Sequence, residues 1–299
     1  MSPLKADKPM TARNEPICST VPQEMRLDTP YGPLAAKRWG TAEGIPTIGL
    51  HGWLDNANTF DLLAPLLPQL QLVSLDLPGH GMSLHRPPGM RYHYTDYVDD
   101  VMTAADMLAW DRFVLLGHSM GAGIGCLVAS AFPDRIDKLI LIESLGAVTN
   151  DSDDPPMALK QSVQAMHHQP MKSLPADRSF DVLVRARAAV GNVSRESAAI
   201  LMQRAVAVEG DTLHWRSDQR LKAPNPLHFT NELMLAYLRG IQAPTLLITA
   251  DEGTLRKRSY FASRCSAIAN LQIVALPGSH HLHLEHPAPV AKAITAFIG

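Results

Sequence analysis

The sequence predicts an α/β protein, with a mostly parallel sheet of about eight strands flanked by helices. Two observations predict this class. Short apolar runs recur along the chain and are typical of strands buried on both faces, and stretches with helical periodicity separate them. Because strands and helices alternate, the strands are expected to lie parallel in one sheet covered on both sides.

The apolar runs predict strands at residues 46–50, 71–77, 112–117, 138–143, 244–250 and 271–276. The periodic stretches between them predict helices at residues 59–69, 94–110, 119–132, 260–269 and 287–298. Two earlier segments, 24–30 and 33–39, are separated by Tyr31 and Gly32 and predict a hairpin at one edge of the sheet.

The alternation stops in residues 146–240, which contain polar helical stretches and a hairpin around residues 211–221. This segment leaves the sheet after the sixth core strand and returns before Pro244, so it is expected to cover the edge where open α/β sheets bind ligands. The predicted organisation is an N-terminal extension (1–23), a core (24–145 and 241–299) and a cap (146–240). Four large apolar residues of the cap suggest an apolar pocket roof, with ordinary packing in the core of the cap helices as the alternative: Met157, Met166, Met171 and Trp215.

Composition excludes several function classes. The 299 residues are 46% hydrophobic and 19% charged with a net charge of −2, so nucleic acid is not expected as a partner. No apolar run approaches the roughly 18 residues of a membrane-spanning helix, and the first twenty residues lack the apolar stretch of a secretory signal. The three cysteines, Cys18, Cys126 and Cys265, are scattered and odd in number, which favours the reducing cytoplasm. The sequence predicts no oligomeric state.

The pentapeptide Gly117-His118-Ser119-Met120-Gly121 matches the pattern G-x-S-x-G between a predicted strand and a predicted helix. A sharp turn at this place forces an unfavourable backbone conformation on the serine, and the flanking glycines remove side chains that would collide. The hydroxyl of Ser119 is therefore expected above the sheet, beside the N-terminus of the next helix, where developing negative charge is favoured. The alternative is a serine N-cap with packing glycines.

Together with "LHGWLDNANTF" (50–60), "LDLPGHGMS" (75–83) and "LPGSHHLHLEHP" (276–287), this motif resembles the α/β-hydrolase fold over nearly the whole chain after residue 24. The segment "LHGWLDNANTF" and the tetrapeptide "DQRL" (218–221) resemble the serine-hydrolase-like branch most closely. The resemblance implies that the backbone amides of Trp53 and Met120 form the oxyanion hole. For Trp53, ordinary packing is the alternative.

The resemblance also implies a histidine base near the end of the chain. The family pattern places it after Pro-Gly, five residues before an acid and seven before a proline, and His280 fits this pattern. His281 is off by one, whereas His283 and His286 are expected on or near the last helix. A metal cluster is the competing interpretation of these histidines; the stretch lacks the order HExxH and has no cysteine nearby.

The triad acid is left open between two carboxylates, with another group or none as the remaining alternative. The family's usual aspartate position holds Gly253 here, which is a departure from the pattern. Glu143, at the end of the sixth core strand, resembles the acid of haloalkane dehalogenase-like members and is the first choice. Asp251, two residues before Gly253, is the second. The alternative for Glu143 is a hydrogen-bonded residue at a strand end without catalytic use.

Other polar residues near these motifs receive structural roles. Asp76 is expected to organise the turn that follows it, and His118 to pack behind the serine. Asp55 and Asn56 are expected to bind neighbouring loops or water. Arg187 is grouped with the arginines of a solvated face or of salt bridges.

The predicted function is that of a carboxylesterase-like serine hydrolase, which cleaves an ester-like bond of a small, apolar substrate through an acyl-enzyme. No cofactor and no metal are required. Serine at the elbow, instead of aspartate, argues against dehalogenase and epoxide hydrolase chemistry. The alternatives are a C–C bond hydrolase, a lactonase, a thioesterase or a lyase on the same fold, and a non-catalytic ligand-binding member of the fold.

Overall fold

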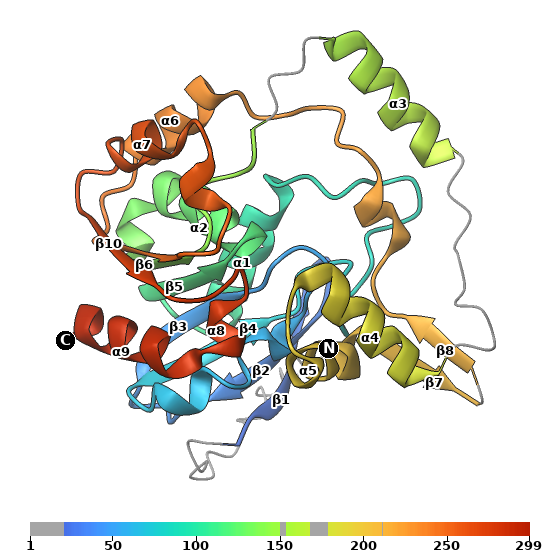
Figure 1. Cartoon of the computed structure of the whole chain (residues 1–299), viewed down its shortest axis with the longest axis horizontal. Coiled ribbons are helices and arrows are strands. Elements are labelled where there is room, and N and C mark those ends of the chain that lie inside the picture. The colour runs from blue at the N-terminus through green and yellow to red at the C-terminus, as the bar shows by residue number, and fades with distance from the viewer. Residues whose placement is uncertain (1–20, 150–153, 168–178, 211) are drawn as a thin grey trace, which may run out of the picture.

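The computed structural model describes residues 21–149, 154–167, 179–210 and 212–299. Within these residues, eight strands form one sheet in the spatial order β1-β2-β4-β3-β5-β6-β9-β10 (Figure 1). Their bounds are β1 Gln23–Thr29, β2 Gly32–Trp39, β3 Ile45–Leu50, β4 Leu70–Leu75, β5 Phe113–His118, β6 Ile136–Ile142, β9 Thr245–Ala250 and β10 Leu271–Leu276. β2 runs antiparallel to β1 and β4, and all other neighbours are parallel. The predicted class and the edge hairpin are therefore confirmed.

Helices cover both faces of this sheet. On one face α2 packs on β5 and β6, with α1 and α6 against it, and on the other face α9 packs on β9 and β10. The helices are α1 Asp96–Met107, α2 Met120–Ala131, α3 Pro155–His167, α4 Phe180–Gly191, α5 Arg195–Ala205, α6 Asn231–Arg239, α7 Phe261–Cys265, α8 Leu282–Glu285 and α9 Pro287–Ile298.

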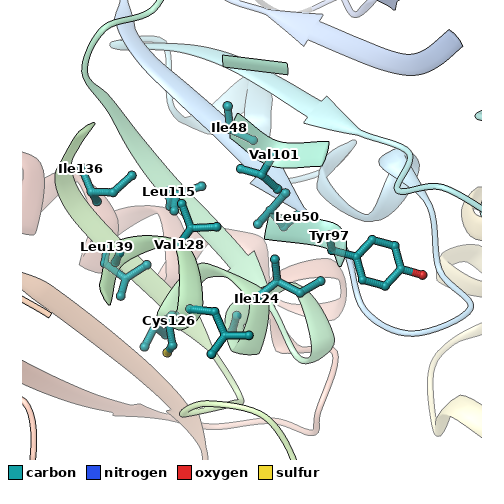
Figure 2. Close-up of a cluster of buried hydrophobic side chains, with 14 of the residues drawn as sticks. Ile48, Leu50, Tyr97, Val101, Leu115, Ile124, Cys126, Val128, Ile136 and Leu139 are labelled. Carbon is teal, nitrogen blue, oxygen red and sulfur yellow. The ribbon is translucent and has the colours of Figure 1, made fainter. Parts of the chain in front are cut away.

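The largest hydrophobic cluster lies between the sheet and helices α1 and α2, and Figure 2 shows part of it. Ile48 and Leu50 of β3 and Leu115 of β5 meet Val101 of α1 and Val128 of α2 in this cluster. Every residue of β4, β5 and β9 is buried, as predicted for parallel strands covered on both faces. β10 differs because it is the last strand of the sheet, and half of its residues are exposed.

The helix predicted at residues 59–69 is wrong. Two short 3₁₀ helices stand there instead, Ala57–Phe60 and Ala64–Leu66. Pro65 and Pro68 explain the difference, because a proline has no N–H to donate to the preceding turn and its ring clashes with that turn. The residues still bury apolar side chains against the sheet. The apolar positions therefore predicted burial correctly, but not an α-helix.

The segment between β6 and β9 carries α3 to α6 and a small hairpin of β7 (Val206–Glu209) and β8 (Thr212–Trp215). α4 and α5 lie side by side and share a small hydrophobic cluster that includes Leu183, Ala198 and Met202 (Figure 1). α6 packs on α2 within the main core. We call residues 146–240 the inserted segment; its role as a cap and the predicted domain boundaries stay predictions.

Two residues that the sequence singled out, Cys18 and Met171, lie outside the described residues. Among the described helices, none has both the length and the apolar character that crossing a membrane requires.

Candidate active site

Ser119 occupies the turn between β5 and α2. Its backbone has φ 50° and ψ −114°, a combination that L residues rarely adopt, and its side chain does not cap the helix. The two glycines of the motif permit the turn: a Cβ atom at residue 121 would lie 2.7 Å from Leu50 Cβ, and one at residue 117 would lie 2.6 Å from the Ala122 amide nitrogen. The serine hydroxyl is thereby directed away from the helix.

His280 lies in the loop after β10, with its imidazole directed at Ser119. Its Nε2 atom is 2.9 Å from Ser119 Oγ, and its Nδ1 atom is 3.3 Å from Glu143 Oε2. Glu143 offers only acceptor oxygens when ionised, so the Nδ1–H tautomer donates to Glu143 and leaves the Nε2 lone pair facing the serine hydroxyl. The structure therefore brings together Ser119, His280 and Glu143, which the sequence spreads over 161 residues.

Glu143 follows β6, and its side chain is fully buried. Its backbone also has a positive φ, 55°, and the Ala250 N–H donates to Glu143 Oε1 at an N···O distance of 2.7 Å. The carboxylate fills the space beside Gly253, because a Cβ atom at residue 253 would lie 2.6 Å from Glu143 Cδ. The departure from the family pattern at Gly253 thus has a steric reason: the glycine leaves the room that the glutamate of the neighbouring strand occupies.

Asp251, the second candidate acid, is placed differently. Its side chain is 54% exposed, and its carboxylate faces Arg256 Nη1 at 3.4 Å. Of the two carboxylates that the sequence left open, the structure places Glu143 in contact with His280 and directs Asp251 towards solvent.

The two predicted amide donors flank the serine. Met120 is the first residue of α2, so its N–H has no partner within the helix. Trp53 follows β3, its side chain is half-exposed, and its indole Nε1–H donates to the Leu221 carbonyl of the inserted segment at 3.2 Å. The Gly121 N–H donates to the His51 carbonyl at 3.0 Å, which joins the segment before Trp53 to the first turn of α2, and Trp53 and Ser119 line the same cavity.

Ser119 and His280 open into a cavity of about 330 Å³ between the core and the inserted segment. Its large apolar lining residues are Trp53 and Leu54 of the core and five residues of the inserted segment: Val190, Leu201, Met202, Ala205 and Trp215. The predicted roof residue Trp215 is among them, whereas Met157 is absent from the lining and is 45% exposed. A cavity of this size holds a small organic molecule.

Comparisons with known proteins identify the family. Residues 48–287 match the family model described as the alpha/beta hydrolase fold. The chain belongs to this family. The chain is 34% identical over 294 residues to serine hydrolase-like protein 2 of Homo sapiens. The alignment covers 92% of this chain and 93% of that protein. The resemblance to the serine-hydrolase-like branch is therefore confirmed.

Two solved structures are similar to the hydrolase. One is a hypothetical protein from Pseudomonas aeruginosa PAO1, with 39% identity and a TM-score of 0.86 over 92% of this chain and 99% of that one. The other is a thioesterase domain from the curacin biosynthetic pathway, with 25% identity and a TM-score of 0.80 over 92% of this chain and 99% of that one.

Of the other histidines in residues 276–287, His281 and His283 are buried beside the candidate base, whereas His286 is exposed at the start of α9. His281 Nε2 faces Asp55 Oδ2 at 3.3 Å instead of Ser119, and His283 Nε2 lies 2.8 Å from Thr59 Oγ1. His118 Nε2 lies 2.9 Å from the His280 carbonyl, and its ring centroid is 4.1 Å from that of His283. Burial holds the pKa of both His118 and His283 well below the usual range, so these two rings are neutral.

Asp55, His118 and His281 are buried, with side-chain atoms close enough together to hold a metal ion. A guanidinium already lies at this cluster. Arg187 Nη2 of α4 is 2.6 Å from Asp55 Oδ1 and 3.3 Å from His281 Nε2. Burial alone would raise the pKa of Asp55, but hydrogen bonding with His281 and the charge of Arg187 outweigh it and lower that pKa, so the carboxylate is ionised. The cluster therefore has its positive charge from the protein itself.

Asp76 has the expected structural role. Its carboxylate accepts from the Ala57 and Met82 amides at 2.7 and 2.8 Å. It also accepts from Arg204 Nε of α5 at 2.8 Å. The sequence did not predict the pairs of Asp76 with Arg204 or of Asp55 with Arg187. Each joins residues more than a hundred positions apart, and no local pattern marks such a pair.

Proposed function

We propose that the protein is a serine hydrolase that cleaves an ester-like bond through an acyl-enzyme. The single observation that carries this proposal is the alignment of Ser119 Oγ, the His280 imidazole and the Glu143 carboxylate, with contacts of 2.9 and 3.3 Å. Ser119 is the nucleophile, His280 the general base and Glu143 the acid that orients the imidazole.

In this mechanism His280 Nε2 accepts the hydroxyl proton as Ser119 Oγ attacks the carbonyl carbon. The amides of Trp53 and Met120 donate to the developing oxyanion, and Glu143 stabilises the imidazolium. The imidazolium then gives its proton to the leaving oxygen, and the alcohol departs. Water attacks the acyl-enzyme and His280 accepts its proton; the imidazolium then returns that proton to Ser119 Oγ as the acyl–Oγ bond breaks and the acid is released. The reaction needs protein groups and water, with neither metal nor cofactor.

The inserted segment is the cap in this proposal. It supplies five of the apolar residues that line the cavity above Ser119. The cavity volume of about 330 Å³ and the apolar lining favour a short, uncharged acyl or alkyl group as the substrate. We also propose a cytoplasmic location and a small-molecule substrate instead of nucleic acid, because the cysteines are few and scattered and the net charge is −2.

A fluorophosphonate probe tests the nucleophile, because it reacts covalently with an activated serine. We expect labelling of Ser119 in the wild type and none in Ser119→Ala, identified by peptide mass spectrometry. A panel of p-nitrophenyl esters from acetate to decanoate then maps acyl length. Turnover should fall by about 10⁶ in Ser119→Ala and by a similar factor in His280→Ala, because nucleophile and base act as a unit. An unlabelled Ser119 together with measurable binding of the esters would identify a ligand-binding member of the fold instead.

Thioester hydrolysis is a second candidate, favoured by the similarity to the thioesterase domain from the curacin pathway. The same serine, histidine and amide donors serve both reactions, since both pass through an oxyanion and an acyl-enzyme. Matched acyl groups, presented as an oxygen ester and as a thioester, separate the two. Thioester hydrolysis is assigned if kcat/KM for the thioester exceeds kcat/KM for the oxygen ester by more than the difference in leaving-group reactivity explains.

A further inference from the structure

Asp55 is a buried carboxylate in the wall of the active-site cavity that the mechanism above does not use. It is 3% exposed and follows Trp53 by two residues, in the loop that starts at the end of β3. Its own N–H donates to the Gly52 carbonyl at 3.1 Å, so the turn that carries Trp53 also fixes Asp55. Asp55 therefore belongs to the loop of the proposed oxyanion hole.

The two carboxylate oxygens of Asp55 contact two other segments. Oδ2 faces Nε2 of His281, the residue after the proposed base, and Oδ1 accepts from Arg187 Nη2 of α4. One side chain thus joins the oxyanion loop, the base loop and the cap. We call Asp55, Arg187 and His281 the clasp.

Hydrogen-bond roles in the clasp follow from the chemistry of its neighbours. His118 Nε2 faces the His280 carbonyl, which can only accept, so the neutral His118 ring carries its proton on Nε2. His118 Nδ1 is then a lone pair, 4.0 Å from Asp55 Oδ2, and it has no hydrogen-bond partner among the described residues. The proton that Asp55 Oδ2 accepts therefore comes from His281 Nε2, so Arg187 Nη2, 3.3 Å from the same nitrogen, packs against the ring without a hydrogen bond to it.

Charge balance couples the clasp to the cap. The core side of this cluster holds the Asp55 carboxylate and two imidazoles, and the guanidinium in contact with Asp55 within the described residues comes from α4. When α4 lies over the cavity, the carboxylate is neutralised. If α4 moved away, Asp55 would keep a buried charge facing the base loop without its counterion, which is unfavourable.

A second cap-to-core pair provides the comparison. Arg204 of α5 pairs with Asp76 at 2.8 Å and with Glu24 of β1. Both arginines come from the inserted segment and both aspartates are buried after a core strand. The Arg204 pair holds α5 on the sheet without a contact to the base loop, whereas the Arg187 pair contacts His281 directly.

We propose that Asp55 is a positioning residue that, through His281 and Arg187, keeps the His280 loop in register with Ser119 when α4 covers the cavity. The clasp links cap position to the placement of the base, so a substrate held under α4 meets an aligned imidazole. This inference rests on the proposed function, because it assigns a role around the same serine and histidine.

The test compares Asp55→Asn, Arg187→Gln, the double variant and Arg204→Gln with the wild type. The measurements are kcat and KM for a p-nitrophenyl ester and the maximal rate of Ser119 labelling by a fluorophosphonate. We expect Asp55→Asn to lower kcat and the labelling rate by about tenfold to a hundredfold and to leave KM within about threefold, because it misplaces the base without reshaping the pocket. The double variant should have the kcat of Asp55→Asn within about threefold, because the two residues act as one unit.

Arg204→Gln is the matched control. It removes the same kind of cap-to-core pair, and we expect a lower Tm with kcat within about threefold of the wild type. The inference fails if Asp55→Asn and Arg204→Gln both lower Tm while kcat and labelling stay at the wild-type level, because Asp55 is then merely structural. It also fails if the losses of the two single variants multiply in the double variant. If Asp55→Asn does not fold, Arg187→Gln alone decides: an unchanged labelling rate overturns the proposal. Failure of wild-type Ser119 to react would instead refute the proposed function.

Discussion

The carboxyl-terminal ends of β6 and β9 lie side by side, because Ile142 pairs with Ile248 in parallel register. The acidic residues that follow these two ends point to different surroundings. Glu143, after β6, is buried and contacts His280. Asp251, after β9, is exposed and faces Arg256. Position in the sheet is similar, so the difference comes from the direction of each side chain and from the space around it.

Gly253 leaves the space that the Glu143 carboxylate occupies. The carboxylate of Glu143 crosses to the β9 loop, where the Ala250 amide donates to it and the missing side chain of Gly253 leaves room. An aspartate at residue 253 and a glutamate at residue 143 would compete for the same volume. The comparison teaches that the two strand ends share one volume beside His280, and that Glu143 occupies it because residue 253 has no side chain.

Among variants at these two strand ends, Glu143→Gln is expected to have the largest effect. The amide is close to the carboxylate in size but cannot stabilise an imidazolium by charge, and its NH₂ group can favour the wrong tautomer of His280. We expect kcat to fall by about 10³ to 10⁴. Steady-state turnover of a p-nitrophenyl ester measures this, with circular dichroism to verify that the variant is folded. Activity close to the wild type would remove Glu143 from the mechanism.

A smaller effect is expected from Gly253→Ala, because the new Cβ atom would press on Glu143 Cδ and displace the carboxylate from His280. We expect kcat to fall by about tenfold to a hundredfold, with KM changed little. The ester assay used for Glu143→Gln measures both constants.

The double variant Glu143→Ser/Gly253→Asp sharpens the same point by moving the acid to the other strand end. It should be at least about tenfold more active than Glu143→Ser alone, because an aspartate at residue 253 enters the vacated volume and can accept from His280 Nδ1. Equal activity of the two variants would show that the volume is not exchangeable between the strand ends.

The sequence predicted much of this arrangement, and the reasons for its failures are physical. Ser119 and His280 carry local signals, a strand-turn-helix motif and a spacing to Pro287, so both were found. Glu143 was preferred because Gly253 stood at the usual acid position. The contact between the Glu143 carboxylate and Gly253 joins two neighbouring strand ends that are far apart in the sequence, so no local pattern could predict it. The same holds for Asp55 and Arg187, which meet through the docking of α4.

The stability of the protein should depend on pH through buried histidines. β5 ends beside β6 at His118, where burial lowers the pKa of His118, and burial likewise lowers the pKa of His283 and takes that of His80 to about 3. A histidine whose folded pKa is below its unfolded value binds more protons in the unfolded state. It therefore lowers the free energy of unfolding progressively as the pH falls below the unfolded pKa. We expect the free energy of unfolding to fall by about 1.4 kcal/mol per pH unit for each such histidine below about pH 6.5.

Urea unfolding at a series of pH values from 7.5 to about 5 measures this dependence. His283→Gln should reduce the slope by about one histidine's share, in addition to any loss of stability at pH 7.5. A slope equal to that of the wild type would mean that His283 is not a neutral, buried ring in the folded protein.

The smallest effect is expected from Asp251→Asn, the control on the β9 side. Its carboxylate is exposed and its pairing distance to Arg256 is 3.4 Å, so solvent screens the interaction and its loss should change stability by less than about 1 kcal/mol. We expect kcat within about twofold of the wild type, because the group neither touches His280 nor is buried. The same ester assay and urea series measure both quantities. A loss of kcat comparable to that of Glu143→Gln would mean that the β9 loop rearranges during turnover and that the acid acts from Asp251, which would reverse the comparison between the two strand ends.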